Sequence, residues 1–149
     1  MNPKLLTAVG IYVAAAAWLT GPAHSIANGQ PDSRSLWSAV FTEEQAKRGH
    51  VVFADECARC HSVDLMGNDD TPALAGEAFL SKWDGRTAGD LFDRIRSSMP
   101  DDNPGQLSNQ QYADVLAHIL SENEFPAGRQ ELAHKTAPLK QIRIDAKRP

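Results

Sequence analysis

Cysteine is scarce in this chain, and its scarcity excludes a disulfide framework. The 149 residues contain two cysteines, Cys57 and Cys60, and a disulfide between residues so close in sequence would constrain almost nothing. Aromatic residues are also few, at 7% of the sequence. A small domain with so few large apolar side chains often has help from a metal or a cofactor in stabilising its core.

Basic charge is in short supply over most of the chain. Residues 26–126 carry 17 Asp and Glu against 8 Lys and Arg, a net charge of −9. Residues 127–149 carry 6 Lys and Arg against 2 Asp and Glu, a net charge of +4. Because an acidic body is a poor surface for nucleic acid or for an anionic membrane, we expect neither as a partner.

The apolar run near the start of the sequence is short for a membrane-spanning helix. Residues 5–19 are apolar apart from Thr7, a run of 15 residues, whereas a transmembrane helix needs about 20. A lysine precedes the run, and Pro22 and several small residues follow it. This layout is typical of a secretory signal peptide, with an uncleaved anchor as the alternative. We expect residues 1–25 to be a signal peptide, the mature protein to be periplasmic, and no stable membrane insertion after cleavage.

Three later segments have the pattern of helices. Thr42 and Gln45 have the spacing of a capping box, and one face of the helix that follows carries Ala46, Gly49, Phe53 and Cys57. A glycine inside a helix costs about 1 kcal/mol relative to alanine, so Gly49 indicates the close approach of another helix.

The second and third helices follow further cap residues. Thr87 is placed to cap "AGDLFDRIRSS", and Ser108 with Gln111 forms a capping box before the last long helix. Residues 62–86 are expected to be irregular, and "LKQIRI" near the end is expected to be extended. The sequence therefore predicts an all-α domain over residues 41–126, a mobile leader over 26–40 and a basic C-terminal tail over 127–149.

The five residues "CARCH" at positions 57–61 carry the strongest chemical signal. A structural zinc site would need four ligands, and no second cysteine pair supplies them. A redox-active dithiol would need a preceding strand in a βαβ setting, whereas a helix is predicted here. Covalent haem c fits the pattern, because each thiol can add across one haem vinyl group while the adjacent His61 binds the iron.

The chain resembles the class I c-type cytochromes, which are small single-haem proteins, over residues 41–126. Besides "CARCH", the resemblance rests on the face formed by Gly49 and Phe53, on "TPALAG" at residues 71–76, on "MP" at residues 99–100 and on the last helix. One departure is His118, which stands where the family usually has an aromatic residue.

The resemblance implies a small cytochrome c fold, with helices and loops wrapped around one haem that is bound through two thioethers. Pro72 would offer its carbonyl oxygen to the Nδ1–H of His61, and Leu74 would press on the haem. Trp83 is a candidate donor to a haem propionate, with core packing as the alternative. Asn103 is a weaker candidate for a hydrogen bond to the sulfur of Met99.

Iron in such a site can hold a second axial ligand, for which the sequence offers Met66, Met99, His50, His118 and His134. Met66 follows His61 too closely to reach the opposite haem face. Two of the histidines lie on predicted helices and one in the tail. Met99 lies 38 residues past His61, on a loop that can close over the haem. We therefore predict His61 and Met99 as the two metal ligands.

A filled pair of axial positions predicts electron transfer and no catalytic residues, because an open position is what binds small molecules. The resemblance implies an exported cytochrome that carries single electrons between a dehydrogenase donor and an oxidase acceptor, with a basic docking face on the partner. The alternative is a cytochrome subunit of a periplasmic or membrane-bound dehydrogenase complex. A gas-binding or peroxidatic haem protein would need an open or weakly held distal site.

Overall fold

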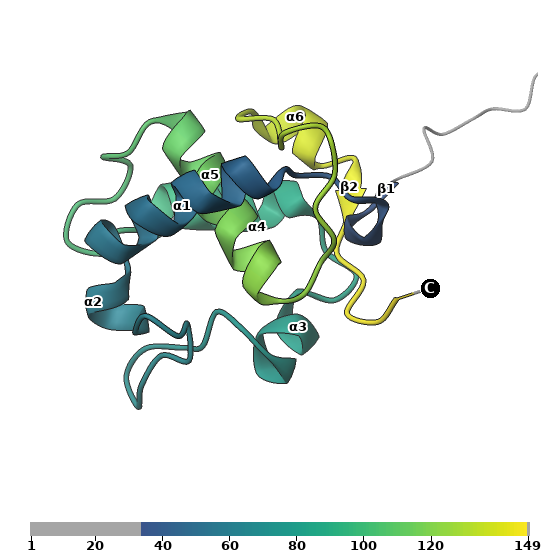
Figure 1. The fold of residues 1–149 in the computed structure, drawn as a ribbon. Coiled ribbons are helices and arrows are strands. Elements are labelled where there is room, and N and C mark those ends of the chain that lie inside the picture. Colours follow the sequence, from purple (N-terminus) through teal and green to yellow (C-terminus); the bar gives the residue numbers. More distant parts are fainter. Residues whose placement is uncertain (1–33, 149) are drawn as a thin grey trace, which may run out of the picture.

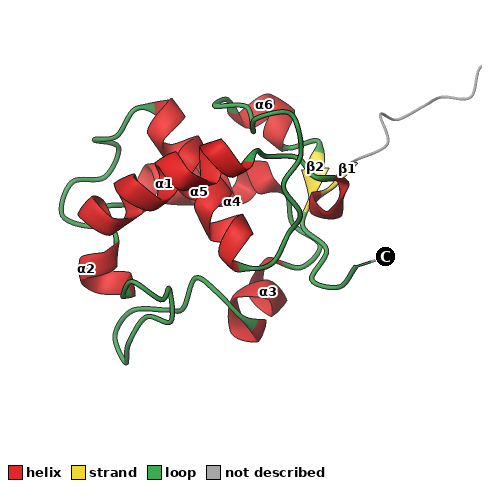
Figure 2. Cartoon of the chain, in the orientation of Figure 1, coloured by secondary structure: helices red, strands yellow, loops and turns green. Residues whose placement is uncertain are grey.

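The computed structural model describes residues 34–148, so the predicted signal peptide and residues 26–33 of the predicted leader lie outside the described residues. The elements are β1 (Arg34–Ser35), a 3-10 turn (Leu36–Ser38), α1 (Glu43–Glu56), α2 (Ala58–His61), α3 (Glu77–Trp83), α4 (Ala88–Ser98), α5 (Asn109–Glu122), α6 (Thr136–Leu139) and β2 (Ile142–Arg143). Figure 2 shows that helices make up nearly all the regular structure, which confirms the predicted all-α class.

Helices α1 and α5 cross at the centre of the molecule (Figure 1), and the crossing explains Gly49. A Cβ atom at position 49 would overlap the backbone carbonyl of Asp114 on α5. The predicted close approach of another helix is therefore confirmed. Arg48 reinforces the crossing, because its Nε and Nη2 each donate to the nearly buried carboxylate of Asp114 at 3.1 Å.

The helix N-termini agree with the predicted caps except for one side chain. The Thr42 hydroxyl accepts from the backbone N–H of Gln45 as expected, but the Gln45 side chain does not complete the box. It is fully buried, and its amide bonds both the N–H and the carbonyl of Leu132, at 2.7 and 3.2 Å. The predicted box at Ser108 and Gln111 is complete. Gln45 thus links α1 to the C-terminal segment through two hydrogen bonds.

Helix α3 is a correction to the sequence analysis, which treated residues 62–86 as irregular. This helix has seven residues and begins after Gly76, which supplies no side-chain cap. It buries Phe79 and Trp83, three and seven positions from Gly76, against the rest of the core. A helix this short and without a cap signal gains its stability from tertiary packing, which local patterns do not report.

The segments on both sides of residues 41–126 are packed into the same domain. Strands β1 and β2 pair in parallel, and Leu36 at the start of the chain's described part is fully buried. From the other end of the chain, four apolar side chains are also in the core: Leu132, Leu139, Ile142 and Ile144. Trp37 donates its indole N–H to the carbonyl of Asp145 at 2.9 Å, which ties the two segments together. The described part of the predicted leader, residues 34–40, is therefore packed in the domain. The same holds for the predicted tail, of which residues 127–148 are described.

Within residues 34–148, none of the helices has the length and apolar character required to cross a membrane.

His118 is buried at the α1–α5 crossing. The centres of the His50 and Phe53 rings lie 5.0 and 5.2 Å from the centre of its ring, in edge-to-face arrangements. Its Nε2 is one buried side-chain atom without a hydrogen-bond partner among the described residues, and its Nδ1 lies 3.7 Å from a carboxylate oxygen of Glu122. Burial lowers the pKa of His118, with a smaller lowering from His50 and an opposing effect of Glu122. The histidine that replaces the family's aromatic residue is therefore held as a neutral ring.

We expect His118 to make the stability of the protein depend on pH. Because its folded pKa is lowered, its contribution is complete above the unfolded pKa of about 6.5 and is lost as the pH falls toward the folded value. The melting temperature of the holoprotein, compared between about pH 7.5 and pH 5, should fall less in His118→Phe than in the wild type. The exposed His134 offers the control, since His134→Phe should keep the wild-type pH dependence. Equal slopes in His118→Phe and the wild type would contradict this expectation.

We expect deletion of residues 129–149 to prevent cooperative folding. The deletion removes four buried apolar side chains and the partners of Gln45, and each fully buried Leu or Ile contributes roughly 2 kcal/mol. Thermal unfolding followed by circular dichroism should lose its sigmoidal transition. A variant that changes charge only, Lys135→Gln with Lys147→Gln, should unfold as the wild type does. A truncated protein with an unchanged transition would show that this segment is not part of the core.

Candidate haem site

The "CARCH" motif lies at the end of α1 and forms the short helix α2. The backbone N–H groups of Cys60 and His61 both bond the carbonyl of Cys57, at 3.1 and 3.0 Å, which winds the motif into one turn. Both cysteines are free thiols. Burial, with small contributions from Glu56 and Cys60, raises the pKa of Cys57 to about 11. Such a thiol is neutral at pH 7, unlike the low-pKa thiolate of a redox-active Cys-x-x-Cys motif.

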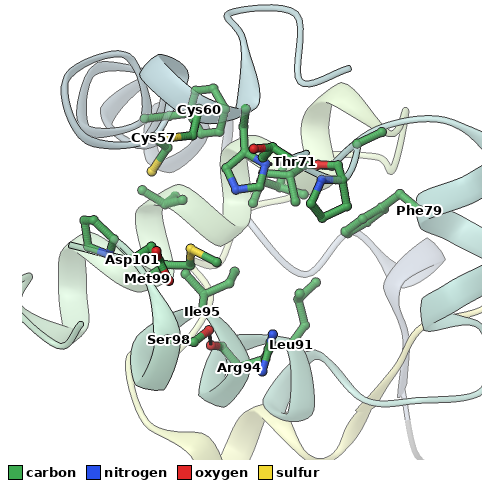
Figure 3. A pocket seen from close by; sticks show the side chains of 18 of the residues that line it. Cys57, Cys60, Thr71, Phe79, Leu91, Arg94, Ile95, Ser98, Met99 and Asp101 are labelled. Atoms are coloured by element: carbon green, nitrogen blue, oxygen red, sulfur yellow. Dashed lines mark hydrogen bonds between the residues drawn. The ribbon is translucent and has the colours of Figure 1, made fainter. Parts of the chain in front are cut away.

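The motif faces a cavity of about 750 Å³, a size typical of cofactor sites. All seven residues that the sequence analysis proposed for haem binding line this one cavity: Cys57, Cys60, His61, Pro72, Leu74, Trp83 and Met99. Figure 3 shows Cys57 and Cys60 on one side of the cavity and Met99, Ile95 and Leu91 on the other. The side chains that the cofactor would need are therefore placed on opposing walls.

His61 is nearly buried, and its orientation is set by a backbone carbonyl. Its Nδ1 lies 3.0 Å from the carbonyl oxygen of Pro72, which assigns the proton to Nδ1 because a carbonyl can only accept. Nε2 is then the ring nitrogen that would be available to a metal ion. This contact is the one that the resemblance implied for Pro72.

The loop that carries Pro72 and Leu74 is fixed to α5 by Asn123. The Leu74 N–H donates to the carbonyl of Leu65 at 2.7 Å, and the Asn123 amide bonds both the carbonyl of Leu74 and the N–H of Gly76, at 2.9 and 3.0 Å. The Asn123 side chain is buried, and both bonds are partly buried. They hold the wall beside His61 in place, a role for Asn123 that the sequence analysis did not identify.

Met99 follows the last residue of α4 and lines the wall of the cavity opposite the cysteines. Of the five candidates for the second axial ligand, all of them within the described range, only Met99 lines the cavity. Met66 is 58% exposed, and His118 is at the helix crossing. Asn103 does not contact the Met99 sulfur, because its amide donates to Gln106 at 3.0 Å; that expectation is wrong in this structure.

The floor of the cavity is apolar, and its rim is charged. Trp83 is 8% exposed and packs against Phe79, while the guanidinium of Arg86 lies 5.6 Å from the centre of its ring. Three basic residues line the same region, namely Lys82, Arg86 and Arg94. Trp83 thus packs in the core and also lies beside cationic groups that suit a carboxylate. The acidic rim residue Asp102 is paired with Arg59 at 2.7 Å.

The donor set fits a c-type haem and does not fit zinc. Among residues 34–148, the structure has no group of three or more His, Cys, Asp or Glu side chains arranged to hold a metal ion. Two thiols, an imidazole oriented by a carbonyl and an opposing thioether around an apolar cavity are what a haem with covalent attachment requires.

Sequence reasoning missed several lining residues that come from different helices. Phe79 lies on the helix that was not predicted, while Leu91 and Ile95 come from α4 and Val115 and Ile119 from α5. Their spacings of four residues were readable as helical faces. The sequence alone does not show that these helix faces meet around one cavity.

The fold and the site together define a class I c-type cytochrome domain. The chain belongs to the family described as cytochrome c oxidase, cbb3-type, subunit III, whose model matches residues 44–119, about half of the sequence. Membership implies a covalently bound haem with its iron and a part in electron transfer.

One solved structure is similar, the sulfane dehydrogenase SoxCD from Paracoccus pantotrophus. The match has a TM-score of 0.48 and 22% sequence identity, and it covers 72% of this chain and 61% of that chain. The likeness is too distant to carry an argument about function. No curated protein matches this chain.

Proposed function

We propose that this chain is an exported mono-haem cytochrome that carries single electrons between periplasmic redox proteins and is not itself an enzyme. The observation that carries the proposal is the pair of opposed walls, with Cys57 and Cys60 on one and Met99 on the other, and with His61 lining the same cavity directly after Cys60 in the chain. The signal-like sequence of residues 1–25 supports export. Haem is usually attached to such motifs outside the cytoplasm, so export agrees with covalent attachment.

Each residue that lines the cavity would have its own role toward the haem. Cys57 and Cys60 would each form one thioether, and His61 Nε2 and the Met99 sulfur would be the two protein ligands. The bound haem would supply one-electron chemistry between ferric and ferrous iron. Pro72 keeps the His61 ring oriented, and the apolar floor excludes water, which disfavours the more highly charged oxidised site. A thioether is a soft ligand that also favours the reduced form.

The proposed partner is a redox protein with a basic docking face. Asp70 and Asp101 are exposed and line the cavity, and residues 26–126 as a whole carry a net charge of −9. Charge complementarity of this kind raises encounter rates at low ionic strength. The alternative, a subunit of a dehydrogenase complex, would use the terminal segments for docking, whereas residues 34–40 and 129–148 are packed on the domain. Purification of the exported protein as a single chain would favour the carrier, and stable co-purification the subunit.

Removing both thiols should leave the haem held by coordination alone. In Cys57→Ala with Cys60→Ala, any haem that is retained should be extracted by acidified acetone, whereas the wild-type haem should stay with the polypeptide. The measurement is the absorbance of the organic phase. Extraction of the wild-type haem would contradict covalent attachment.

Met99→Ala should remove the second axial ligand. We expect loss of the weak far-red absorption band of a ferric thioether bond, a lower reduction potential, and binding of cyanide or carbon monoxide at the freed position. Met66→Ala is the matched control, because Met66 is an exposed methionine near the same motif and should leave the spectrum unchanged. If Met99→Ala keeps the band, the ligand is another residue.

A further inference from the structure

The backbone of Met99 is held from both sides by two different helices. Its N–H donates to the carbonyl of Ile95 on α4 at 2.8 Å, and its carbonyl accepts from the phenol of Tyr112 on α5 at 2.7 Å. Tyr112 is 1% exposed, and Pro100, which follows Met99, is also buried. This hydrogen bond is partly buried, and proline supplies no N–H to the neighbourhood, so the phenol is the protein group that satisfies the Met99 carbonyl oxygen.

The position of Tyr112 is itself fixed by the packing of α5. It is in the first turn of α5, directly after the complete capping box of Ser108 and Gln111, and α5 is locked to α1 at Gly49. Tyr112 does not line the cavity, whereas Val115 and Ile119 on the same helix do. Any effect of its hydroxyl on a bound cofactor must therefore pass through Met99.

The rest of the loop from Met99 to Leu107 is held by exposed contacts. Arg59 pairs with Asp102 at 2.7 Å, and Gln106 donates to Glu56 at 2.9 Å, both of them at the surface. Exposed pairs of this kind contribute little to stability, because water competes for both partners. Among residues 34–148, the bond from Tyr112 is the one hydrogen bond between α5 and this loop, and it is partly buried.

We propose that Tyr112 is a positioning residue for the Met99 thioether. Its phenol fixes the Met99 carbonyl, and with it the Cα from which the side chain reaches into the cavity, so that the sulfur is held ready for the iron. The proposal rests on the proposed function, because it takes Met99 as the second axial ligand. It adds that the strength of this ligand is set by a tyrosine that touches neither the cofactor nor the sulfur.

The test is Tyr112→Phe in the exported holoprotein, which removes one hydroxyl and keeps the ring. We expect the binding constant for imidazole, which competes with Met99 for ferric iron, to rise about five- to tenfold, the effect of losing one partly buried hydrogen bond. The far-red thioether band should also disappear at a lower denaturant concentration, well before the global unfolding transition.

Two control variants separate positioning from general loss of stability. Ile144→Val trims a core side chain far from Met99 in the sequence and should lower the melting temperature by an amount comparable to Tyr112→Phe, with imidazole affinity unchanged. Asp102→Asn removes the charge of the exposed pair on the same loop and should raise imidazole affinity less than twofold, because that ion pair is solvated.

The outcomes distinguish this inference from the function on which it rests. Wild-type affinity for imidazole in Tyr112→Phe, or a rise no larger than in Ile144→Val, would overturn the role of Tyr112 while leaving Met99 as ligand. A far-red band that is absent from the wild type, or that survives in Met99→Ala, would overturn Met99 ligation and the role of Tyr112 together. A rise confined to Tyr112→Phe supports the proposal.

Discussion

The contact on which the rest of this structure depends is the crossing of α1 and α5 at Gly49. No side chain fits between the two backbones there, and the Arg48–Asp114 pair fixes the rotation of one helix against the other. The end of α1 carries the cysteine motif, and α5 carries Tyr112, Val115 and Ile119 on its way to the capping residue Asn123. Setting the crossing therefore sets the position of the motif relative to the floor of the cavity and to the residue that holds Met99.

Two loops complete the site, and each is anchored to α5 by a buried polar side chain. Asn123 at the end of the helix holds the segment of Leu74 and Gly76 beside Pro72, and Tyr112 at its start holds Met99. These hydrogen bonds are partly buried and come from buried side chains, so both loops have defined positions despite their lack of regular structure. Helix α5 therefore supports both the loop beside His61 and the loop that begins at Met99.

The two ends of the described chain lie side by side, where β1 and β2 meet, and close one side of the domain (Figure 1). The parallel pairing of β1 with β2, the Trp37–Asp145 bond and the stitch from Gln45 to Leu132 make residues 34–40 and 129–148 part of the core. A domain with few aromatic residues gains apolar area in this way. It also follows that the positive charge of the last segment belongs to the surface of the folded domain, where it offsets part of the acidic charge of residues 26–126.

Local patterns in the sequence were enough for the three long helices, for the Gly49 contact and for the chemistry of "CARCH", because capping, helical periodicity and ligand spacing are properties of neighbouring residues. The resemblance added Pro72, Leu74 and Met99, which the fold brings to a single cavity. Tertiary structure alone decided the rest. Helix α3 has no cap and too few residues to be stable by itself, Gln45 exchanged its expected capping role for a partner 87 positions away, and the terminal segments became core through contacts across nearly the whole chain. Each of these depends on the free energy of burying surfaces that are distant in sequence, a quantity that no local pattern contains.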